Sequence, residues 1–499
     1  MPSESVCMFV YNSFVHDARV LKEAQTLVNG GYQVTVVALL GDGLPDEEFI
    51  DGIHILRVPK NPVHLRLIQF LRCDFCRLHF FPYLKRSIGD PLLSLRANPR
   101  HTKLLSYDDV NQSMRGDAYP RLKSNQYVQN IRAIFYGVRR KAGRILIGGK
   151  RAIARLLIAG NRAIARVAIT GVRMCVMPFH RQLCFLDYYL RTDKRLAGEA
   201  FSIYHAHDLN TLPLAWRLAR RHHGCLVYDS HEYYLERNRA VKYTFFGRWW
   251  RKKLEGYLVR SADLNITVNE SIATMLGERY GVNPFKVIMN APARRDVVVG
   301  DQECDLHNVL GICRTNKILL YLGAITFNRG LERVIESLQY LPECHLVMMG
   351  FGKDDYKQGL LAEAEHFSVR DRLHFFGPVP SEMVTSYACS ADVGVAAIKN
   401  VCLSYYYCSP NKVFEYVLSG LPVAASDFPE LRKVVCDYNV GLTFNPEDPK
   451  DIAETIREIL GSPEIRKNLR ANGLLAAEAF NWEKESKKLL SNYRALGTH

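Results

Sequence analysis

The sequence predicts an α/β protein with two Rossmann-like domains that face a cleft, and with a basic, largely helical insertion in the N-terminal domain. Three observations lead to this class. Short apolar runs typical of buried parallel strands alternate with helical patterns in two separate blocks of the chain. The length of 499 residues, 48% of them hydrophobic, is enough for two or three folded domains. The excess of positive charge is confined to one segment that interrupts the first block.

The first block opens with VCMFVY, a helical pattern over 19–28 and then VTVVAL. Strand, helix, strand in this order is the unit of a parallel sheet. The same alternation resumes after the insertion, where we expect strands over 201–205, 225–229 and 264–268 and a helix over 212–221. These elements predict an N-terminal domain over 1–292, interrupted by an insertion over about 60–195.

The second block begins near Lys317 and contains five strand candidates, KILLYLG, HLVMMG, LHFFG, DVGVAA and PVAAS. Helical patterns over 331–338 and 410–419 lie between them. We expect a C-terminal domain over 293–475, entered through a polar linker, and a closing helix over 476–499. Two such domains place the carboxyl ends of both sheets at the cleft, where α/β proteins bind ligands. This organisation favours an enzyme with two substrates.

The strongest local motif is SPNKVFEYVLSGLPVAAS, which begins at Ser409. Ser409 is a good N-cap and Pro410 suits the first helical position, so Lys412 is expected in the first turn of a helix. Free backbone N–H groups and the helix dipole favour an anion there, and a diphosphate fits this description. Glu415, on the same helix face, can accept hydrogen bonds from vicinal hydroxyls. The alternative is an ordinary capped helix with an ion pair between Lys412 and Glu415.

A second motif, YLGAITFNRGLERVIESL, places Gly323 at a strand end and Arg329 at a helix start. A glycine at this point lets a phosphate approach the backbone, and an arginine can bind that phosphate with two hydrogen bonds. By itself the pattern has low specificity, because strand–glycine–helix junctions are common in α/β proteins.

Two strand ends in the N-terminal block carry polar residues. YHAHDLN provides His207 and Asp208, and YDSHEYY provides Asp229, His231 and Glu232. Histidines and carboxylates can bind a metal, but their spacing matches no usual zinc motif, so we expect no metal site. We interpret these side chains as polar residues that line the cleft, with structural capping as the alternative.

Ten fragments in one order resemble the retaining glycosyltransferases of family four, which have the GT-B fold. The similarity covers most of the chain outside the insertion. The fragments are HDARVLKEAQTLVNGGYQVTVVAL, YHAHDLNTLPLA, VYDSHEYY, SADLNITVNESIA, VIMNAP, YLGAITFNRGLERVIESL, LHFFGPVP, SADVGVAAIKN, SPNKVFEYVLSGLPVAAS and FNWEKESKKLLSNYRAL. The resemblance implies a glycosyltransferase that takes a sugar from a nucleotide-sugar donor.

On the donor side, the resemblance implies that Arg329 and Lys412 hold the diphosphate and that Glu415 holds the nucleotide ribose. Gly377 and Val379, in LHFFGPVP, match the loop whose backbone contacts the nucleobase. Two positions depart from the common pattern. Tyr407 stands where many members have a glutamate, and Ala324 stands where many have an arginine after the strand-end glycine. The positive charge opposite the diphosphate therefore depends mainly on Arg329 and Lys412.

At the reaction centre, His207 resembles the histidine that meets the donor sugar, and Asp17 and Arg19 belong to the loop that borders the acceptor pocket. The acceptor side would also include Asp208, Asp229, His231 and Glu232. With Arg329 and Lys412, His207 completes the predicted catalytic set. The family mechanism implies retention, with a donor phosphate oxygen deprotonating the acceptor and with no metal or other cofactor. Two cations and a helix N-terminus would stabilise the departing diphosphate.

The segment from Ala118 to Leu186 contains fourteen Lys and Arg residues and no Asp or Glu, while the rest of the chain carries 52 basic and 51 acidic residues. Seven arginines alternate at spacings of four and seven, which groups them on one face of an amphipathic helix over about 139–174. They are Arg140, Arg144, Arg151, Arg155, Arg162, Arg166 and Arg173. An apolar face opposite them favours contact with an anionic membrane surface. The alternative is packing on a partner; nucleic acid is not expected, because no aromatic residue lies among these cations.

The expected partners are thus a nucleotide-sugar, a lipid-linked or glycan acceptor and an anionic membrane. We expect a cytoplasmic protein, peripheral on the cytoplasmic face of a membrane, since the sequence shows no secretory signal and scattered cysteines. The pair Cys73 and Cys76 alone is a weak metal signal. Two rival functions are a nucleotide-sugar epimerase or hydrolase and a non-catalytic scaffold that recruits partners to a membrane.

Overall fold

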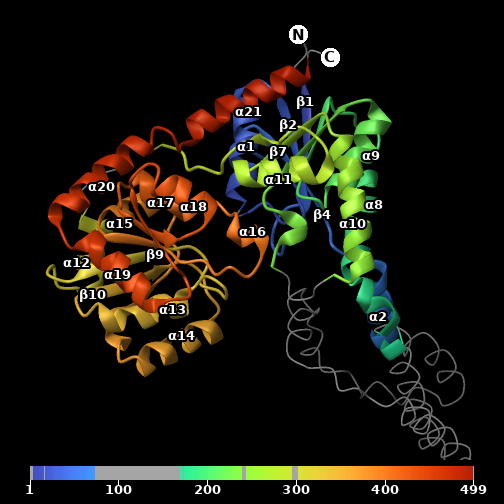
Figure 1. The fold of residues 1–499 in the computed structure, drawn as a ribbon. Helices are drawn as coiled ribbons and strands as arrows, with labels where there is room; N and C mark the ends of the chain where they lie inside the picture. The colour runs from blue at the N-terminus through green and yellow to red at the C-terminus, as the bar shows by residue number, and fades with distance from the viewer. Residues whose placement is uncertain are drawn as a thin grey trace, which may run out of the picture. The chain divides into compact units, whose positions relative to one another are not determined.

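The structure is a computed structural model that describes residues 4–15, 17–73, 169–171, 174–238, 243–294 and 302–497. The chain forms two compact units, one made of Met1–Pro59 with Tyr188–His499 and the other of Lys60–Asp187. Both predicted Rossmann-like sheets belong to the first unit. Figure 1 shows each sheet with helices packed on it.

The N-terminal sheet has eight strands in the order β3-β4-β2-β1-β5-β6-β7-β8, parallel except for β3. Its strands are β1 (Ser5–Phe9), β2 (Gln33–Leu39), β3 (Glu47–Ile50), β4 (Ile53–Val58), β5 (Ile203–His207), β6 (Cys225–Ser230), β7 (Leu264–Thr267) and β8 (Lys286–Val287). The accompanying helices are α1 (Ala18–Asn29), α9 (Leu212–His222), α10 (Phe245–Arg260) and α11 (Glu270–Tyr280). Every strand that we predicted in this block is present, within two residues at most boundaries.

Sequence analysis missed the hairpin between β3 and β4. Asp51 and Gly52 form its turn, with φ angles of 49° and 80°. An Asp-Gly pair with both φ angles positive is the favoured two-residue hairpin turn, so the signal was present in FIDGIHILRV. The hairpin adds an antiparallel edge strand and leaves the parallel centre of the sheet unchanged.

The C-terminal sheet has six parallel strands in the order β11-β10-β9-β12-β13-β14. Its strands are β9 (Lys317–Leu322), β10 (Cys344–Met349), β11 (Leu373–Phe376), β12 (Val393–Ala396), β13 (Val423–Ser426) and β14 (Gly441–Phe444). Its helices are α12 (Leu306–Leu310), α13 (Leu331–Ser337), α14 (Asp354–His366), α15 (Val384–Cys389), α16 (Leu403–Tyr406), α17 (Asn411–Leu418), α18 (Pro429–Val435) and α19 (Pro449–Leu460). The strand order reverses direction at β9 and β12, where doubly wound sheets bind ligands.

Both sheets bury both faces, which explains why their strands are continuous apolar runs. In β1, Cys7 and Phe9 pack in one hydrophobic cluster, while Val6 and Met8 pack in another on the opposite face. In β9, Leu320 and Leu319 divide in the same way. A strand covered by helices on both faces does not alternate apolar and polar residues. The apolar runs therefore predicted the parallel class correctly.

The closing helix expected over 476–499 is present as α21 (Trp482–Leu496), and a further helix, α20 (Pro463–Ala476), precedes it. Asn481 caps α21 by accepting a hydrogen bond from the Lys484 N–H, so the break lies just before it. Helix α21 packs on the N-terminal block: the Trp482 indole donates to Thr26, 2.9 Å away, and Tyr493 contacts His205. Figure 1 shows α21 crossing beside α1. The last segment of the chain thus ties the two sheets together.

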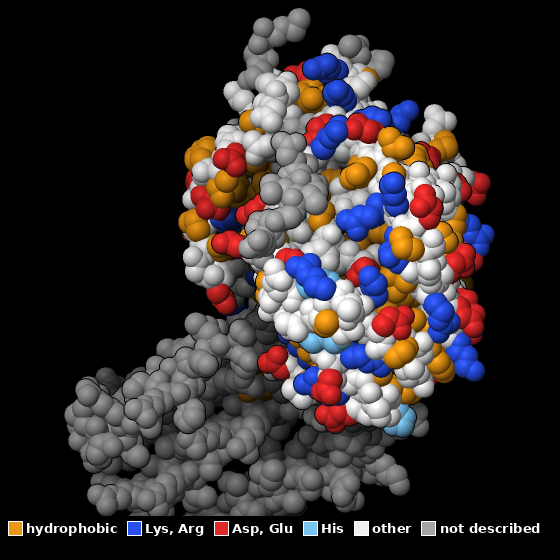
Figure 2. Space-filling view, turned by 90° about the vertical axis from the view of Figure 1, so that its left-hand side faces the viewer, with side chains coloured by type: hydrophobic (Ala, Val, Ile, Leu, Met, Phe, Trp, Pro, Cys, Tyr) orange, Lys and Arg blue, Asp and Glu red, His pale blue; other side chains and the backbone are white. Residues whose placement is uncertain are grey.

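The second unit is described at its two ends. Helix α2 (Val63–Cys73) leads into it, and a short 3-10 turn followed by α8 (His180–Arg195) leads out. The seven arginines of the predicted membrane helix over 139–174 lie outside the described residues. Cys76 and the side chain of Cys73 lie outside them as well. Within the described residues, none of the helices combines the length and apolar content that a membrane crossing needs. On the face turned to the viewer in Figure 2, basic and acidic side chains are interspersed.

Candidate active site

Three glycines follow three neighbouring strands of the C-terminal sheet. Gly323 comes after β9, Gly350 after β10 and Gly377 after β11. Gly323 and Gly350 have φ angles of 108° and 149°. A Cβ added at Gly350 would lie 2.1 Å from the Gly323 carbonyl oxygen, so no side chain fits there. The edge is therefore lined by backbone that a ligand can approach closely; Gly350 was missed, although MMGFG showed the same strand-end signal.

Lys412 lies in the first turn of α17, and its side chain is buried. Its Nζ is 3.4 Å from the centre of the Tyr321 ring. The ammonium also points towards Gly323, since a Cβ added there would be 3.9 Å from Nζ. Burial, and next the nearby Arg329 guanidinium, hold the pKa of Lys412 well below its usual value. The structure therefore brings the two predicted motifs, SPNKVFE and YLGAITFNRG, into one site.

Arg329 reaches the same region from the loop before α13. Asn328 and Gly330 on either side of it have φ angles of 64° and 65°, which bend the chain sharply at this point. The guanidinium carbon lies 5.2 Å from the centre of the Tyr405 ring. Neither Arg329 nor Lys412 forms an ion pair with a carboxylate of the described residues. Two adjacent cations that lack a carboxylate partner favour the binding of an anion.

Glu415 follows Lys412 by one helical turn and is largely shielded from solvent. Burial raises the pKa of its carboxyl, and the charges of Lys412 and of Lys22 on α1 oppose that rise. The expected ion pair between Lys412 and Glu415 is not among the contacts shorter than 4.0 Å, which weakens the ordinary-helix alternative. One cap prediction was wrong: Pro410 is the N-cap, and the Ser409 hydroxyl accepts a hydrogen bond from Asn269 instead.

Gly377 and Val379 lie directly after β11, an edge strand of the sheet. Gly377 is exposed, and a Cβ added there would meet nothing within 4 Å. Val379 is partly buried against the core. The two residues are thus placed on the same glycine-lined edge as Gly323, which is where a nucleobase loop is expected, while their role stays a prediction.

Arg19 is buried and bound by other residues of the chain, and its place beside an acceptor pocket stays a prediction. Its guanidinium donates to both oxygens of Asp229, each at 2.9 Å, and to the Ile288 carbonyl at 2.7 Å. Its Nε also lies 3.0 Å from a Glu23 oxygen. All three charged side chains are buried. Arg19 therefore fastens α1 to the carboxyl end of β6, and a bound acceptor cannot compete for it without unmaking this pairing.

The histidines of β5 and β6 extend this cluster. His207 Nδ1 is 3.0 Å from His231 Nε2, and His231 Nε2 is 3.1 Å from Asp229. Although burial lowers it, the two neighbouring carboxylates Asp229 and Asp208 raise the pKa of His231 to about 9, so this ring is charged at neutral pH. Burial lowers the pKa of His207, whose ring is almost fully enclosed. His231, with 21% of its side chain exposed, is the member of this chain of contacts that reaches solvent.

Four of these ligand-type side chains lie close enough to hold a metal ion: Glu23, His205, His207 and Asp229 have ligand atoms within 4.8 Å of one another. The Arg19 guanidinium already occupies both oxygens of Asp229, and Tyr493 bonds to His205. A divalent cation here would meet a fixed positive charge at short range. The Arg19 charge therefore opposes a metal ion here, whereas both Glu23 oxygens and one ring nitrogen each of His205 and His207 lack a hydrogen-bond partner among the described residues. The expectation of no metal stays a prediction.

The other acceptor-side candidates are also engaged. Asp17 caps α1 through the Val20 N–H, and its second oxygen accepts from Asn12. Asp208 has a φ of 64° and accepts from the His231 N–H. Glu232 accepts from Arg237 and from Ser404 of α16, which links the two sheets. The acceptor-side role of these residues stays a prediction.

Sequence analysis missed a surface on α10, which we call the aromatic surface. Phe245, Phe246, Trp249 and Trp250 are exposed on one stretch of this helix, Phe245 to 90%. Basic residues accompany them, namely Arg248, Arg251, Lys252 and Lys253. Exposed aromatic clusters of this kind mark interaction sites on soluble proteins. The letters FFGRWWRKK carry the signal, because they place four large aromatics where a surface helix normally has few.

Solved structures with this architecture include sucrose-phosphate synthase from Thermosynechococcus elongatus, with a TM-score of 0.65 and 15% identity over 99% of each chain. HepE from Anabaena in complex with UDP and glucose has a TM-score of 0.58 and 12% identity, over 99% of this chain and 100% of that chain. At these identities the likeness concerns the fold. Two parallel sheets with a cationic, glycine-lined edge thus form the GT-B fold, the class of nucleotide-sugar-dependent glycosyltransferases.

Family models define the group within this class. The model for "Glycosyl transferases group 1" matches residues 304–475 and the model for "Glycosyltransferase Family 4" matches residues 148–291. Similar curated proteins include a D-inositol 3-phosphate glycosyltransferase of Xylanimonas cellulosilytica, 24% identical over 62% of this chain and 76% of that protein. A phosphatidyl-myo-inositol mannosyltransferase of Mycobacterium leprae is 22% identical over 62% of this chain and 77% of its own length. The chain is a glycosyltransferase and belongs to family 4.

Proposed function

We propose that this enzyme transfers a sugar from a nucleotide-sugar to a lipid-linked or membrane-bound acceptor, with retention of configuration, in the synthesis of a glycan or surface polysaccharide. The observation that carries the donor half is the meeting of Lys412 and Arg329 beside Gly323, without carboxylate partners among the described residues. A nucleoside diphosphate supplies the negative charge that this site lacks. Glu415, one turn further along α17, would accept hydrogen bonds from the ribose hydroxyls.

The leaving group gives these residues their role in the reaction. As the bond between the sugar and the diphosphate breaks, negative charge grows on the diphosphate, and two fixed cations stabilise that charge more strongly than they stabilise the bound donor. A diphosphate oxygen takes the proton of the attacking acceptor hydroxyl, so the new glycosidic bond forms on the face that the leaving group vacates. This route needs no metal ion and no protein base.

Donor binding also changes the pKa of Lys412. Its pKa is depressed while the site is empty, because burial and Arg329 both oppose the ammonium form. A diphosphate beside Nζ removes that penalty and raises the pKa again. Donor binding therefore favours the charged form of Lys412.

Membrane association is supported by two features of the chain. The basic segment provides attraction to anionic lipids, and the aromatic surface provides side chains that enter the headgroup region. The similar protein of Mycobacterium leprae is named for a lipid acceptor, phosphatidyl-myo-inositol. A peripheral position on the cytoplasmic face of a membrane, where nucleotide-sugars are available, agrees with both features.

The donor half is tested by measuring the thermal stability of the protein against UDP, GDP, ADP and CMP. One diphosphate should raise the melting temperature, and the Glu415→Ala and Lys412→Ala variants should lose that shift. Transfer is then tested with the matching radiolabelled nucleotide-sugar and a membrane lipid extract, by extraction of label into the organic phase. Release of free sugar without an acceptor would instead support a hydrolase, and no response to any nucleotide would support the scaffold.

The membrane half is tested by flotation with liposomes that contain anionic lipid. Deletion of residues 139–174 and the substitution of Phe245 and Trp250 by serine should each weaken flotation while nucleotide binding persists. Both aromatics are exposed, so their replacement should leave folding intact, and Phe351→Ser offers a matched control because Phe351 is equally exposed outside this surface. Unchanged flotation in both variants would contradict the membrane role.

A further inference from the structure

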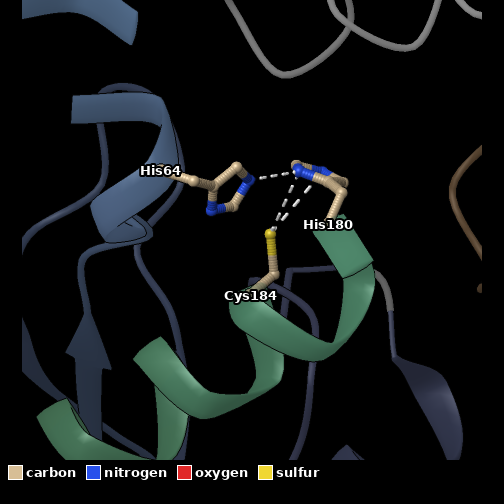
Figure 3. A group of neighbouring side chains, drawn as sticks. All are labelled: His64, His180 and Cys184. Carbon is tan, nitrogen blue, oxygen red and sulfur yellow. Dashed lines mark hydrogen bonds between the residues drawn. The ribbon is translucent and has the colours of Figure 1, made fainter. Parts of the chain in front are cut away.

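Two helices that bracket the inserted unit bring together a set of metal-ligating side chains outside the donor site. His64 lies on α2, and His180 and Cys184 are one turn apart on α8. Figure 3 shows the two imidazoles and the thiol pointing towards one another. Their ligand atoms all lie within 4.8 Å of one another. All three side chains are buried, with at most 5% of each residue exposed.

The distances between these atoms are close to those around a tetrahedral ion. His64 Nε2 is 2.7 Å from His180 Nδ1, and the Cys184 sulfur is 3.5 and 3.8 Å from the two ring nitrogens of His180. Zinc bonds of roughly 2.0–2.1 Å to nitrogen and 2.3 Å to sulfur separate two nitrogen donors by about 3.4 Å and a nitrogen from a sulfur by about 3.6 Å. The two imidazoles must separate further, by about 0.7 Å, which a small side-chain rotation provides.

The hydrogen bonds inside the cluster do not account for all of its polar atoms. His64 Nδ1 is buried and has no hydrogen-bond partner among the described residues. A buried polar atom without a partner is uncommon in folded proteins and often marks an unseen water or ion. The thiol, in turn, makes only long contacts with His180. A cation bound by the three side chains would give the Cys184 sulfur a close partner.

We propose that His64, His180 and Cys184 bind a structural zinc-type ion that joins the first and last helices of the inserted unit. Imidazole nitrogen and thiolate sulfur are the donors this ion prefers, and a water molecule can complete the tetrahedron. Binding releases the thiol proton of Cys184 to solvent. Because His64 and His180 are 116 residues apart, the ion closes a long loop, which restricts the unfolded chain.

The test measures metal in the full-length protein, purified through a tag without histidine and dialysed against buffer with and without zinc. Plasma mass spectrometry should find about one zinc per chain. Cobalt substituted for zinc should give the ultraviolet charge-transfer band of a cobalt–thiolate bond. His64→Gln and Cys184→Ser should each weaken zinc binding more than about tenfold, and Cys184→Ser should abolish the band.

Two controls separate this site from other ligands of the chain. Cys175→Ser removes an exposed thiol close in sequence, and His366→Gln removes a histidine at the end of α14; both should keep the metal. The cluster of Glu23, His205, His207 and Asp229 contains no thiol, so its cobalt complex would lack the band. If a variant fails to fold, the wild-type protein still tests the proposal, because a chelator should lower its melting temperature and zinc should restore it. Wild-type protein without bound zinc or a zinc-dependent shift, or full binding in both ligand variants, would overturn the proposal.

Discussion

The carboxyl ends of the two sheets differ in how their charges are arranged. At the N-terminal sheet, Arg19 forms ion pairs with Asp229 and Glu23, and His231 extends this network through Asp229. At the C-terminal sheet, Lys412 and Arg329 lie near each other without a carboxylate ion pair among the described residues, and the buried Lys412 has a depressed pKa. In the first arrangement the buried guanidinium is ion-paired within the protein, and in the second the two cations have no carboxylate ion pair among the described residues.

This difference shows which charged residues act on a ligand. A buried network of ion pairs is rigid and expensive to disturb, so it positions neighbouring groups. A buried cation without a partner costs stability and persists where a ligand provides the missing charge. Charged residues with similar sequence settings, each after a strand or at a helix start, therefore serve different purposes in the two sheets.

The largest expected effect comes from breaking the ion pairs of Arg19. Asp229→Asn removes the charge opposite the buried Arg19 and replaces one of its acceptor oxygens by an NH2 group, and we expect it to lower the free energy of unfolding by about 3–5 kcal/mol. Denaturant titration measures this change. Asp427→Asn, which removes an exposed partner of Arg432, is the control and should cost less than about 1 kcal/mol. Equal effects of the two substitutions would contradict the contrast between them.

A second effect concerns the backbone of the open edge. Gly350→Ala forces a methyl group against the Gly323 carbonyl, so we expect a loss of about 2–4 kcal/mol in unfolding free energy. Gly377→Ala adds the same methyl group in open space and should change stability by less than about 0.5 kcal/mol. Thermal melting of the two variants compares them directly. If Gly350→Ala left the melting temperature unchanged, Gly350 and the Gly323 carbonyl would not be in close contact.

The charge imbalance of the open edge is tested with Lys412→Met, which keeps most of the side-chain volume. We expect the affinity for the nucleoside diphosphate to fall by about 10–100-fold, because a charge-assisted contact worth about 1.5–3 kcal/mol is lost. The melting temperature without nucleotide should stay the same or rise, since a buried unpaired cation is removed. Calorimetric titration measures the affinity, with Lys450→Met on the exposed side of α19 as control. A loss of stability with unchanged affinity would make Lys412 a structural residue.

The last expected effect is a pH dependence of stability, caused by His231. The pKa of His231 is raised to about 9 in the folded protein, above the ordinary histidine value. A raised folded pKa stabilises the fold below the unfolded pKa, and this contribution disappears as pH rises through the folded value. Unfolding free energy should therefore fall by up to about 3 kcal/mol between roughly pH 6.5 and 9. His231→Gln should flatten this decline in denaturant titrations, whereas an unchanged slope would place the titration elsewhere.

Much of the fold was predictable because strand and helix signals are local. The runs VTVVAL and KILLYLG are largely apolar without alternation, as a strand covered on both faces requires, and the order of elements then implies a parallel sheet. The Lys412 motif was predictable for a similar reason, since helix starts attract anions by their own geometry. The aromatic surface on α10 was readable in FFGRWWRKK, although a helix in isolation does not reveal which of its faces is exposed.

The sequence by itself determined two parallel sheets, a segregated basic insertion and a cationic helix start in the second sheet, because each depends on residues near one another in the chain. Only the tertiary structure decided that Arg19 is bound by Asp229, 210 positions away, and that Lys412 lies beside Gly323. It also decided that α21 returns to the N-terminal block and that His64 meets His180. The physical reason is that charge and hydrogen bonding act through space at a few ångströms, whatever the separation along the chain.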